Sequence, residues 1–361
     1  MEFGYKRQHT ESNVRAMRKI AVLNQKGGVG KTTTVANTAA ALAASGQRVA
    51  VIDLDPQANL TIHLGLEPDT VNAGAYEVLT QSAQFEQELL LVRPNLWLLA
   101  SNINLVGAES ELVSVVGREI ILREAIESSE ERFDYLIIDC APSLGLLTLN
   151  ALAAAEEALI PLQPHFLALQ GFGKLLQTVD IVSKRINPKL RVKWVLLCMY
   201  DSRASLPGEV RADIEQFLEG ARGGVCAWAE AQVVPVCIRR NIKLAEAPSY
   251  GKTIFEYERN CHGAEDYARV AEFIHNGALT SPEPTGTPGR SAQADEEAPG
   301  GIAADGPPSS ERHDRPDDAA DPEQPSIQII SIPRSGHREQ ESELADSDVE
   351  NNSQLDFDSA E

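Results

Sequence analysis

Short apolar runs rich in valine, isoleucine and leucine alternate with longer segments rich in alanine and leucine between residues 18 and 279. The short runs predict buried strands and the longer segments predict helices. The expected strands are Ile20–Asn24, Val49–Asp53, Leu96–Ala100, Tyr135–Asp139, Ala158–Leu162, Val192–Met199 and Gln232–Val236. The expected helices are Thr32–Ser45, Glu109–Ser128, Leu146–Ala155, Leu169–Ile186, Glu209–Leu218 and Glu265–Leu279. Because strand and helix alternate, we predict an α/β fold: a mostly parallel, twisted sheet flanked by helices.

The two ends of the chain differ from this alternating region. Residues 280–361 hold 10 of the 20 prolines, and their 20 acidic residues against 5 arginines give −15 of the total net charge of −21. This composition buries too little apolar surface to offset chain entropy, so we expect a disordered, acidic, proline-rich tail. Within the tail, Ile327–Ile332 is either a chance apolar cluster or a strand that adds to a partner's sheet edge. We expect residues 1–17 to form a flexible arm and residues 18–279 to form one domain.

Cysteine usage and hydropathy exclude several classes of protein. The five cysteines are scattered without a Cys-x-x-Cys pair, and the N-terminus lacks the apolar core of a signal peptide. The longest apolar stretches are broken before the roughly 18 residues that a membrane span requires. These features exclude secreted and transmembrane classes and favour a cytoplasmic location.

A glycine-rich segment, Lys26-Gly-Gly-Val-Gly-Lys-Thr-Thr33, connects the first expected strand to the first expected helix. In this context the segment predicts a P-loop, whose backbone N–H groups and helix N-terminus bind phosphates. Lys31 would neutralise the β- and γ-phosphates, and the Thr32 hydroxyl would bind Mg²⁺. The candidate phosphate-binding residues are Gly27, Gly28, Val29, Gly30, Lys31, Thr32 and Thr33. The alternative is a glycine-rich turn that binds no ligand.

Acidic residues end two of the expected strands. Asp139 follows an apolar run and would lie at the carboxyl edge of the sheet, where such folds bind ligands, so we interpret it as the Walker B acid that holds Mg²⁺. Asp53 and Asp55 end the strand that begins at Val49, and the alternation of a strand places both carboxylates on one side. An isolated pair of this kind is often just a solvated strand end, but here it accompanies a P-loop.

Four motifs occur along the chain: KGGVGKTT from Lys26, the Asp53-Leu-Asp-Pro-Gln57 run, LIIDCAPSLGLLTLNAL from Leu136, and IKLAEAPSYGKTIFEY from Ile242. Together they resemble ParA/Soj-type partition ATPases of the deviant Walker A class, which are relatives of MinD. The last motif and Met199–Arg203 favour the Soj-like branch. The resemblance covers residues 17–279.

The resemblance implies an ATPase that forms a homodimer around two ATP molecules with Mg²⁺. Lys26 would then act across the dimer on the partner's nucleotide, Asp55 would orient the attacking water, and Asp53 would support Mg²⁺ or the switch region. Hydrolysis would be slow and stimulated by a ParB-type DNA-binding partner. The ATP-bound dimer would bind double-stranded DNA nonspecifically, so the protein would associate with the nucleoid.

Two groups of basic residues are candidates for DNA binding. The first lies at a helix-to-strand junction and consists of Lys184, Arg185, Lys189, Arg191 and Lys193; a solvated helix end is an equally good explanation. The second consists of Arg203, Arg239, Arg240 and Lys243, of which Arg203 and Lys243 match DNA-contacting positions of the family. The family usually has Ile-Pro-Arg-Asn where this chain has Ile238-Arg-Arg-Asn241. This departure affects the expected contact of Asn241 with adenine.

Three alternatives differ in their predicted partner. In the first, the same ATP switch positions a protein cargo and has no segregation role. In the second, cysteines hold a metal cluster between subunits, but no second cysteine follows Cys140 at short spacing. In the third, the protein binds membranes as MinD does, but the last expected helix carries acidic residues instead of a basic amphipathic face. We therefore expect no membrane partner.

Overall fold

The computed structural model describes residues 16–165 and 168–279, all of which belong to one compact unit. Most of the expected N-terminal arm, the whole acidic tail and its Ile327–Ile332 run lie outside the described residues.

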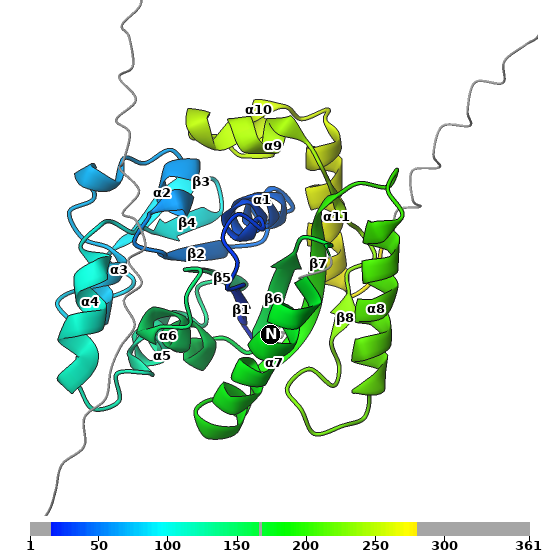
Figure 1. Cartoon of the computed structure of the whole chain (residues 1–361). Coiled ribbons are helices and arrows are strands. Elements are labelled where there is room, and N and C mark those ends of the chain that lie inside the picture. The colour runs from blue at the N-terminus through cyan, green and yellow to red at the C-terminus, as the bar shows by residue number, and fades with distance from the viewer. Residues whose placement is uncertain (1–15, 166–167, 280–361) are drawn as a thin grey trace, which may run out of the picture. The chain divides into compact units, whose positions relative to one another are not determined.

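A nine-stranded sheet runs through the described unit in the order β3-β4-β2-β5-β1-β6-β7-β8, and β9 also pairs with β7 (Figure 1). All pairs are parallel except β3 with β4. The strands are β1 Arg18–Val22, β2 Val49–Leu54, β3 Leu89–Arg93, β4 Leu96–Leu99, β5 Tyr135–Cys140, β6 Glu157–Leu162, β7 Arg191–Tyr200, β8 Gln232–Val233 and β9 Ile238–Arg239. This arrangement confirms the predicted mostly parallel sheet.

Helices cover both faces of the sheet (Figure 1). The longer ones are α1 Lys31–Ala44, α6 Leu146–Ala154, α7 Ala168–Arg185, α8 Leu206–Gly220 and α11 His262–Asn276. The shorter ones are α2 Asn59–His63, α3 Ala75–Leu79, α4 Leu105–Glu111, α5 Ile121–Ile126, α9 Ile242–Glu246 and α10 Ile254–Tyr257. A 3₁₀ turn, η4, covers Ala247–Tyr250.

Two apolar cores form because successive residues of each strand point to opposite faces. In β1, Ile20 and Val22 belong to the core that includes α1 and α11. Ala21 and the following Leu23 belong to the other core, which includes α5, α6 and α7. The sheet is therefore buried on both sides, as its nearly continuous apolar strands predict.

The predicted helix Glu109–Ser128 is wrong. The chain instead forms α4, a short 3₁₀ turn, an irregular stretch and α5. Val115 has an extended backbone and Gly117 has a φ of +76°, so the helix cannot continue through this stretch. The β-branched pair before a glycine is the physical reason, because both residue types are poor helix formers.

The sequence analysis missed strands β3 and β9. β3 is an antiparallel edge strand that reaches β4 through a tight turn at Pro94 and Asn95, where Asn95 has a φ of +60°. β9 has two residues and carries too little pattern to identify.

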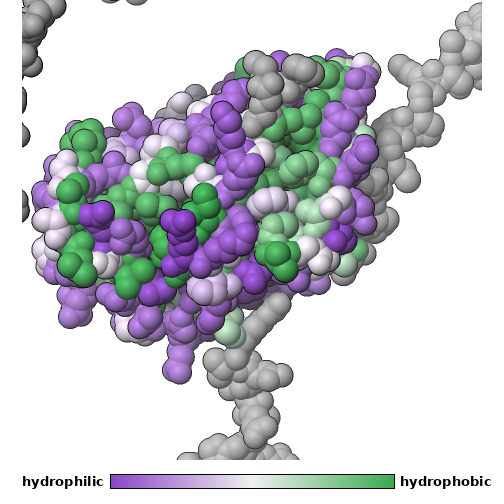
Figure 2. Space-filling view, turned by 60° about the horizontal axis from the view of Figure 1, so that its bottom comes forward, coloured by the Kyte–Doolittle hydropathy of each residue, from purple (hydrophilic) through white to green (hydrophobic). Residues whose placement is uncertain are grey.

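Hydrophilic residues separate the exposed apolar residues into groups on the face turned forward in Figure 2. Exposed apolar side chains of the described residues include Ile103, Val106, Val113 and Val116, which lie in or near α4 and the stretch after it.

Candidate functional site

The glycine-rich segment forms a tight loop between β1 and α1. Gly28 and Gly30 have positive φ angles of 71° and 96°, which a residue with a Cβ adopts only at a cost. Asn24 fixes the start of the loop: its Nδ2 donates to the Pro161 carbonyl at 2.7 Å, and its Oδ1 accepts from the Lys26 N–H at 3.0 Å. The loop therefore has the shape in which backbone N–H groups can surround an anion.

Lys31 and Asp139 lie buried below this loop. The Lys31 ammonium donates to the Lys26 carbonyl at 3.3 Å. Burial lowers the pKa of Lys31, although the negative charges of Asp139 and Asp55 act to raise it. Neither carboxylate oxygen of Asp139 has a hydrogen-bond partner in the described part of the chain. Burial raises the pKa of Asp139 well above its usual range, Asp53 adds to this shift, and the nearby Thr32 hydroxyl and Lys31 charge oppose it. The site thus contains a buried carboxylate that accepts no hydrogen bond of ordinary geometry from the described residues, although the Thr32 hydroxyl and the Lys31 charge act on it.

Asp53 is the neighbour of Asp139 on the adjacent strand, because β2 and β5 are parallel and in register at these two residues. Unlike Asp139, Asp53 is fully hydrogen-bonded: it accepts from the N–H and the hydroxyl of Thr61, both at 2.8 Å, and from the Asp55 N–H at 3.2 Å. Burial raises the pKa of Asp53 to about 6, although the bonds from Thr61 act in the opposite direction.

Asp55 follows β2 and faces the cleft beside the P-loop. Its Oδ1 accepts from the Gln57 N–H at 3.0 Å, and its backbone carbonyl accepts from the Ser101 hydroxyl at 2.8 Å. The Ser101 N–H in turn donates to the Thr61 hydroxyl at 2.9 Å. Thr61 and Ser101 therefore fix Asp53, in β2, and Asp55, just after it. No local motif marks Thr61 or Ser101, so the sequence did not predict their roles.

Lys26 is exposed at the surface of the P-loop. Its ammonium contacts Nε2 of His165, which follows β6. Burial and the Lys26 charge lower the pKa of His165, so its ring is neutral and can accept from the lysine. The lysine is thus held within its own chain by a contact that the sequence analysis did not expect.

Two cavities meet at the end of the P-loop. The first, of about 490 Å³, is the phosphate cleft; it is lined by Gly27, Lys31, Thr32, Asp55 and residues around them. The second, of about 400 Å³, is mostly apolar and is lined by residues of β7, β9 and α9, including Ile238, Asn241, Ile242 and Leu244. The Asn241 side chain accepts from the Lys243 N–H at 2.9 Å and so caps α9 at the wall of this apolar cavity.

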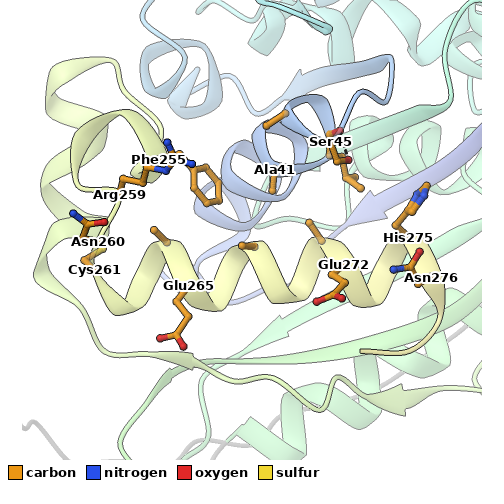
Figure 3. A pocket seen from close by; sticks show the side chains of 15 residues that line it. Ala41, Ser45, Phe255, Arg259, Asn260, Cys261, Glu265, Glu272, His275 and Asn276 are labelled. Atoms are coloured by element: carbon orange, nitrogen blue, oxygen red, sulfur yellow. Dashed lines mark hydrogen bonds between the residues drawn. The ribbon is translucent and has the colours of Figure 1, made fainter. Parts of the chain in front are cut away.

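A larger hollow of about 770 Å³ lies elsewhere, between the end of α1 and α11 (Figure 3). Its lining includes Ala41, Ser45, Glu265 and His275. Ala41 lies ten residues after Lys31 in α1, or about 15 Å at the helical rise per residue. The hollow is therefore remote from the phosphate cleft.

The second group of basic residues is brought together at the carboxyl end of β7. Arg203 and Arg240 are exposed, and neither forms a salt bridge with any described residue. Lys243 pairs with Glu246 at 2.9 Å, and this pairing raises its pKa. Arg239 is the most strongly paired of the four, because its guanidinium binds two acids that precede Tyr267 in α11.

Those acids are Asp266, which is buried, and Glu265, which pairs with Arg239 at 2.7 Å. They raise the pKa of Arg239 and neutralise most of its charge. The sequence analysis grouped Arg239 with the exposed arginines because it could not foresee its partners on a distant helix. In the first basic group, several members are also paired: Lys184 with Asp180, Lys189 with Glu156 and Lys193 with Glu230.

Among the described helices, none has the length and apolar character needed to cross a bilayer. In the same part of the chain, no three side chains of histidine, cysteine, aspartate or glutamate are grouped so that they could hold a metal ion.

Comparison with known proteins assigns the family. A family model described as an AAA domain matches residues 17–192. The chain is 41% identical to the sporulation initiation inhibitor protein Soj of Bacillus subtilis over 256 residues, which are 71% of this chain and 97% of that protein. It is 43% identical to the chromosome-partitioning ATPase Soj of Thermus thermophilus over 72% of this chain and 95% of that protein.

Solved structures agree with the sequence relatives. The crystal structure of cobyrinic acid a,c-diamide synthase from Mycobacterium smegmatis, with bound ATP analog and magnesium, is 36% identical and has a TM-score of 0.62 over 73% of this chain and 98% of that chain. The cell division ATPase MinD of Pyrococcus furiosus is 26% identical and has a TM-score of 0.58 over 72% of this chain and 99% of that chain. The chain therefore belongs to the family of Soj/ParA chromosome-partitioning ATPases.

Proposed function

We propose that this ATPase segregates DNA by an ATP-driven dimer switch. ATP and Mg²⁺ bind each subunit, two subunits join face to face, and the dimer binds double-stranded DNA nonspecifically on the nucleoid. A ParB-type partner then stimulates slow hydrolysis, and the dimer releases the DNA. The observation that carries the proposal is the buried pair below the P-loop, Lys31 with its lowered pKa and Asp139 with no hydrogen-bond partner.

The residues present fit a magnesium ion. The unpartnered oxygens of Asp139 lie close to the Thr32 hydroxyl, and oxygen atoms are the ligands that Mg²⁺ prefers. Thr32 and Asp139 would hold the ion, directly or through water, and the ion would neutralise charge on the phosphates. Asp53 has three hydrogen bonds of its own, which favour a role in fixing the loop after β2 over direct contact with the ion.

Lys26 and Asp55 are proposed to complete the site in the dimer. Lys26 is exposed, so it can leave His165 and reach the nucleotide of a second subunit. Lys31 already serves the phosphates of its own subunit, so a second lysine is most useful across the interface. The Asp55 Oδ2 atom accepts no hydrogen bond from the described residues, and this oxygen would orient the attacking water.

Four basic residues are proposed to bind DNA phosphates: Arg203, Arg239, Arg240 and Lys243. Arg203 and Arg240 are the strongest candidates, because their charges are not neutralised by acids of the described chain. Arg239 would contribute less, since forming a phosphate contact requires it to leave Asp266 and Glu265. Its main effect would be to hold β9 against α11 so that its neighbours are correctly placed.

Sedimentation of the full chain with and without MgATP tests the switch. The wild type should be monomeric alone and dimeric with MgATP. Lys31→Ala should lose nucleotide binding, whereas the matched Lys26→Ala variant should still bind nucleotide as a monomer but fail to dimerise. A wild type that stays monomeric with saturating MgATP would contradict the proposal.

DNA binding by the same proteins tests the output. Binding should require MgATP and weaken steeply between two salt concentrations, because it depends on phosphate neutralisation. A protein that dimerises with MgATP but does not bind DNA would instead indicate a positioning ATPase for a protein cargo.

A further inference from the structure

Asp55 is held by hydrogen bonds at every polar atom except one. Its N–H donates to Asp53 Oδ1 at 3.2 Å, and its own Oδ1 accepts from the Gln57 N–H at 3.0 Å. Its backbone carbonyl accepts twice, from the Ala58 N–H and from the Ser101 hydroxyl, each at 2.8 Å. The remaining atom, Oδ2, accepts no hydrogen bond from the described residues, so it is the atom that can act on a ligand.

The turn from Asp55 to Ala58 contains a backbone conformation that alanine rarely adopts. Ala58, which begins α2, has a φ of +53° and a ψ of 32°, in the left-handed region. In this region the Cβ of a residue other than glycine crowds the backbone, so the conformation is unfavourable. It persists only where the surrounding structure holds it in place. The turn that sets the position of Asp55 therefore needs support from outside itself.

Ser101 supplies this support from the end of β4. It is buried, and its hydroxyl donates to the same Asp55 carbonyl that closes the turn with Ala58. Its N–H donates to the Thr61 hydroxyl at 2.9 Å, and the Thr61 hydroxyl donates to Asp53 at 2.8 Å. Because the Asp55 N–H also donates to Asp53, these four residues form a closed ring of hydrogen bonds. The ring fastens the turn to the ends of two neighbouring strands, β2 and β4.

We propose that Ser101 is a positioning residue for ATP hydrolysis: its hydroxyl holds the strained turn so that Asp55 Oδ2 faces the attacking water. This inference rests on the proposed function, since it takes Asp55 to orient that water. Asp55 lines the phosphate cleft and Ser101 does not, so Ser101 acts only through Asp55. A positional effect of this kind changes the rate because phosphoryl transfer depends mainly on positioning and charge.

The test measures kcat and KM for MgATP hydrolysis by the full chain. Ser101→Ala should lower kcat about three- to tenfold, the effect of one lost hydrogen bond, and leave KM within about twofold of the wild type. In an Asp55→Ala background the same substitution should have no further effect, because the carboxylate that it positions is absent. Ser183→Ala is the matched control: it removes a buried hydroxyl that donates to the Leu190 carbonyl, away from the cleft, so kcat should stay unchanged.

A second substitution tests the part played by the turn. Glycine adopts the left-handed conformation without penalty, so the turn of an Ala58→Gly variant should keep its shape without the Ser101 hydroxyl. Adding Ala58→Gly to Ser101→Ala should therefore restore kcat to within about twofold of the wild type. Thermal melting checks that each variant is folded. If Ser101→Ala melts too low to assay, Ser101→Cys replaces it, because a thiol is similar in shape but donates only a weak hydrogen bond.

The outcomes separate this inference from the function on which it rests. The role of Ser101 is overturned, while the role of Asp55 stands, by any of three results: unchanged kcat in Ser101→Ala, an equal loss in the Asp55→Ala background, or no recovery with Ala58→Gly. If Asp55→Ala hydrolyses ATP as fast as the wild type, or the wild type hydrolyses none, the proposed function itself fails and takes this inference with it.

Discussion

Replacing Asp139 with asparagine should stabilise the nucleotide-free protein while abolishing its magnesium-dependent nucleotide binding. The reason is that burial and the neighbouring Asp53 disfavour the charged form of Asp139 by more than the Lys31 charge and the Thr32 hydroxyl favour it, so that the pKa of Asp139 is raised well above its usual range. Asparagine has nearly the same shape and no charge. The substitution should therefore improve the fold and remove the function together.

The pKa of Asp53 gives the scale of the effect. Burial raises this pKa from 3.8 to about 6, and one pKa unit corresponds to about 1.4 kcal/mol, so the folded state favours the protonated form by about 3 kcal/mol. Because the folded state holds its proton more tightly than the unfolded state, the free energy of unfolding falls as the pH rises from about 4 to about 6 and stays low above that range. The pKa of Asp139 is raised as well.

For Asp139→Asn we expect a net gain in stability that is smaller than the value worked out for Asp53. The buried amide also lacks partners, which costs about 1–2 kcal/mol. The variant should then be more stable than the wild type near pH 8 by on the order of 1 kcal/mol, as expected for removing one disfavoured buried charge, which raises Tm by roughly a few degrees for a domain of this size. Near pH 5, where the acids of the wild type hold protons, the gain should largely disappear.

Thermal melting followed by circular dichroism, with EDTA present, measures the stability difference between the variant and the wild type at pH 5 and at pH 8. Asp134→Asn is the matched control, because Arg48 lowers the pKa of Asp134 by a hydrogen bond and an ion pair. A lowered pKa stabilises the fold above pH 4 and the stability is lost as the pH falls, so this control should destabilise the protein at pH 8. If Asp139→Asn is no more stable than the wild type at pH 8, the buried charge does not destabilise the fold and the reasoning fails.

Three further predictions concern the switch, the DNA contacts and a close packing point. Asp55→Ala should bind MgATP but hydrolyse it at least about tenfold more slowly, so that the dimer persists on DNA; normal turnover would exclude Asp55 from positioning the water. Arg203→Ala should weaken DNA binding and reduce its salt dependence. Arg222→Ala, which removes the same charge from an arginine just after α8 that pairs with Glu219, should change neither. Gly251→Ala should lower the free energy of unfolding, measured by chemical denaturation, by about 2 kcal/mol or more, because its φ is +60° and the added Cβ would lie 2.7 Å from the backbone of Gly65. Gly46→Ala is the control: its φ is also positive but its Cβ would enter open space, so it should destabilise the fold less.

The sequence predicted which residues lie together at the carboxyl edge of the sheet because the signals for their positions are local. The P-loop is a contiguous motif between a strand and a helix, and Asp53 and Asp139 each end an apolar run. In a parallel sheet the carboxyl ends of strands share one edge, so two such acids come together without knowledge of any other contact. The register of β2 with β5 places these two acids as direct neighbours.

The supporting residues could not be predicted because no local motif marks their contacts, which form between different secondary-structure elements. Asp53 accepts from Thr61, and Arg239 binds Asp266 through a strand-to-helix contact that spans 27 residues. A basic residue looks the same in sequence whether it faces solvent or a buried acid. The irregular stretch that replaces the predicted helix Glu109–Ser128 shows the same limit, because a valine pair and a glycine override an apolar pattern that otherwise suits a helix.

Three features that oppose folding lie around the phosphate cleft. Asp139 is buried without a partner, Lys31 is buried with a lowered pKa, and Met199 has a left-handed backbone. Proteins tolerate such features where they serve a ligand. MgATP would supply a cation for Asp139 and anions for Lys31, so binding should relieve the first two costs directly. Binding of MgATP should therefore raise the free energy of unfolding of the protein.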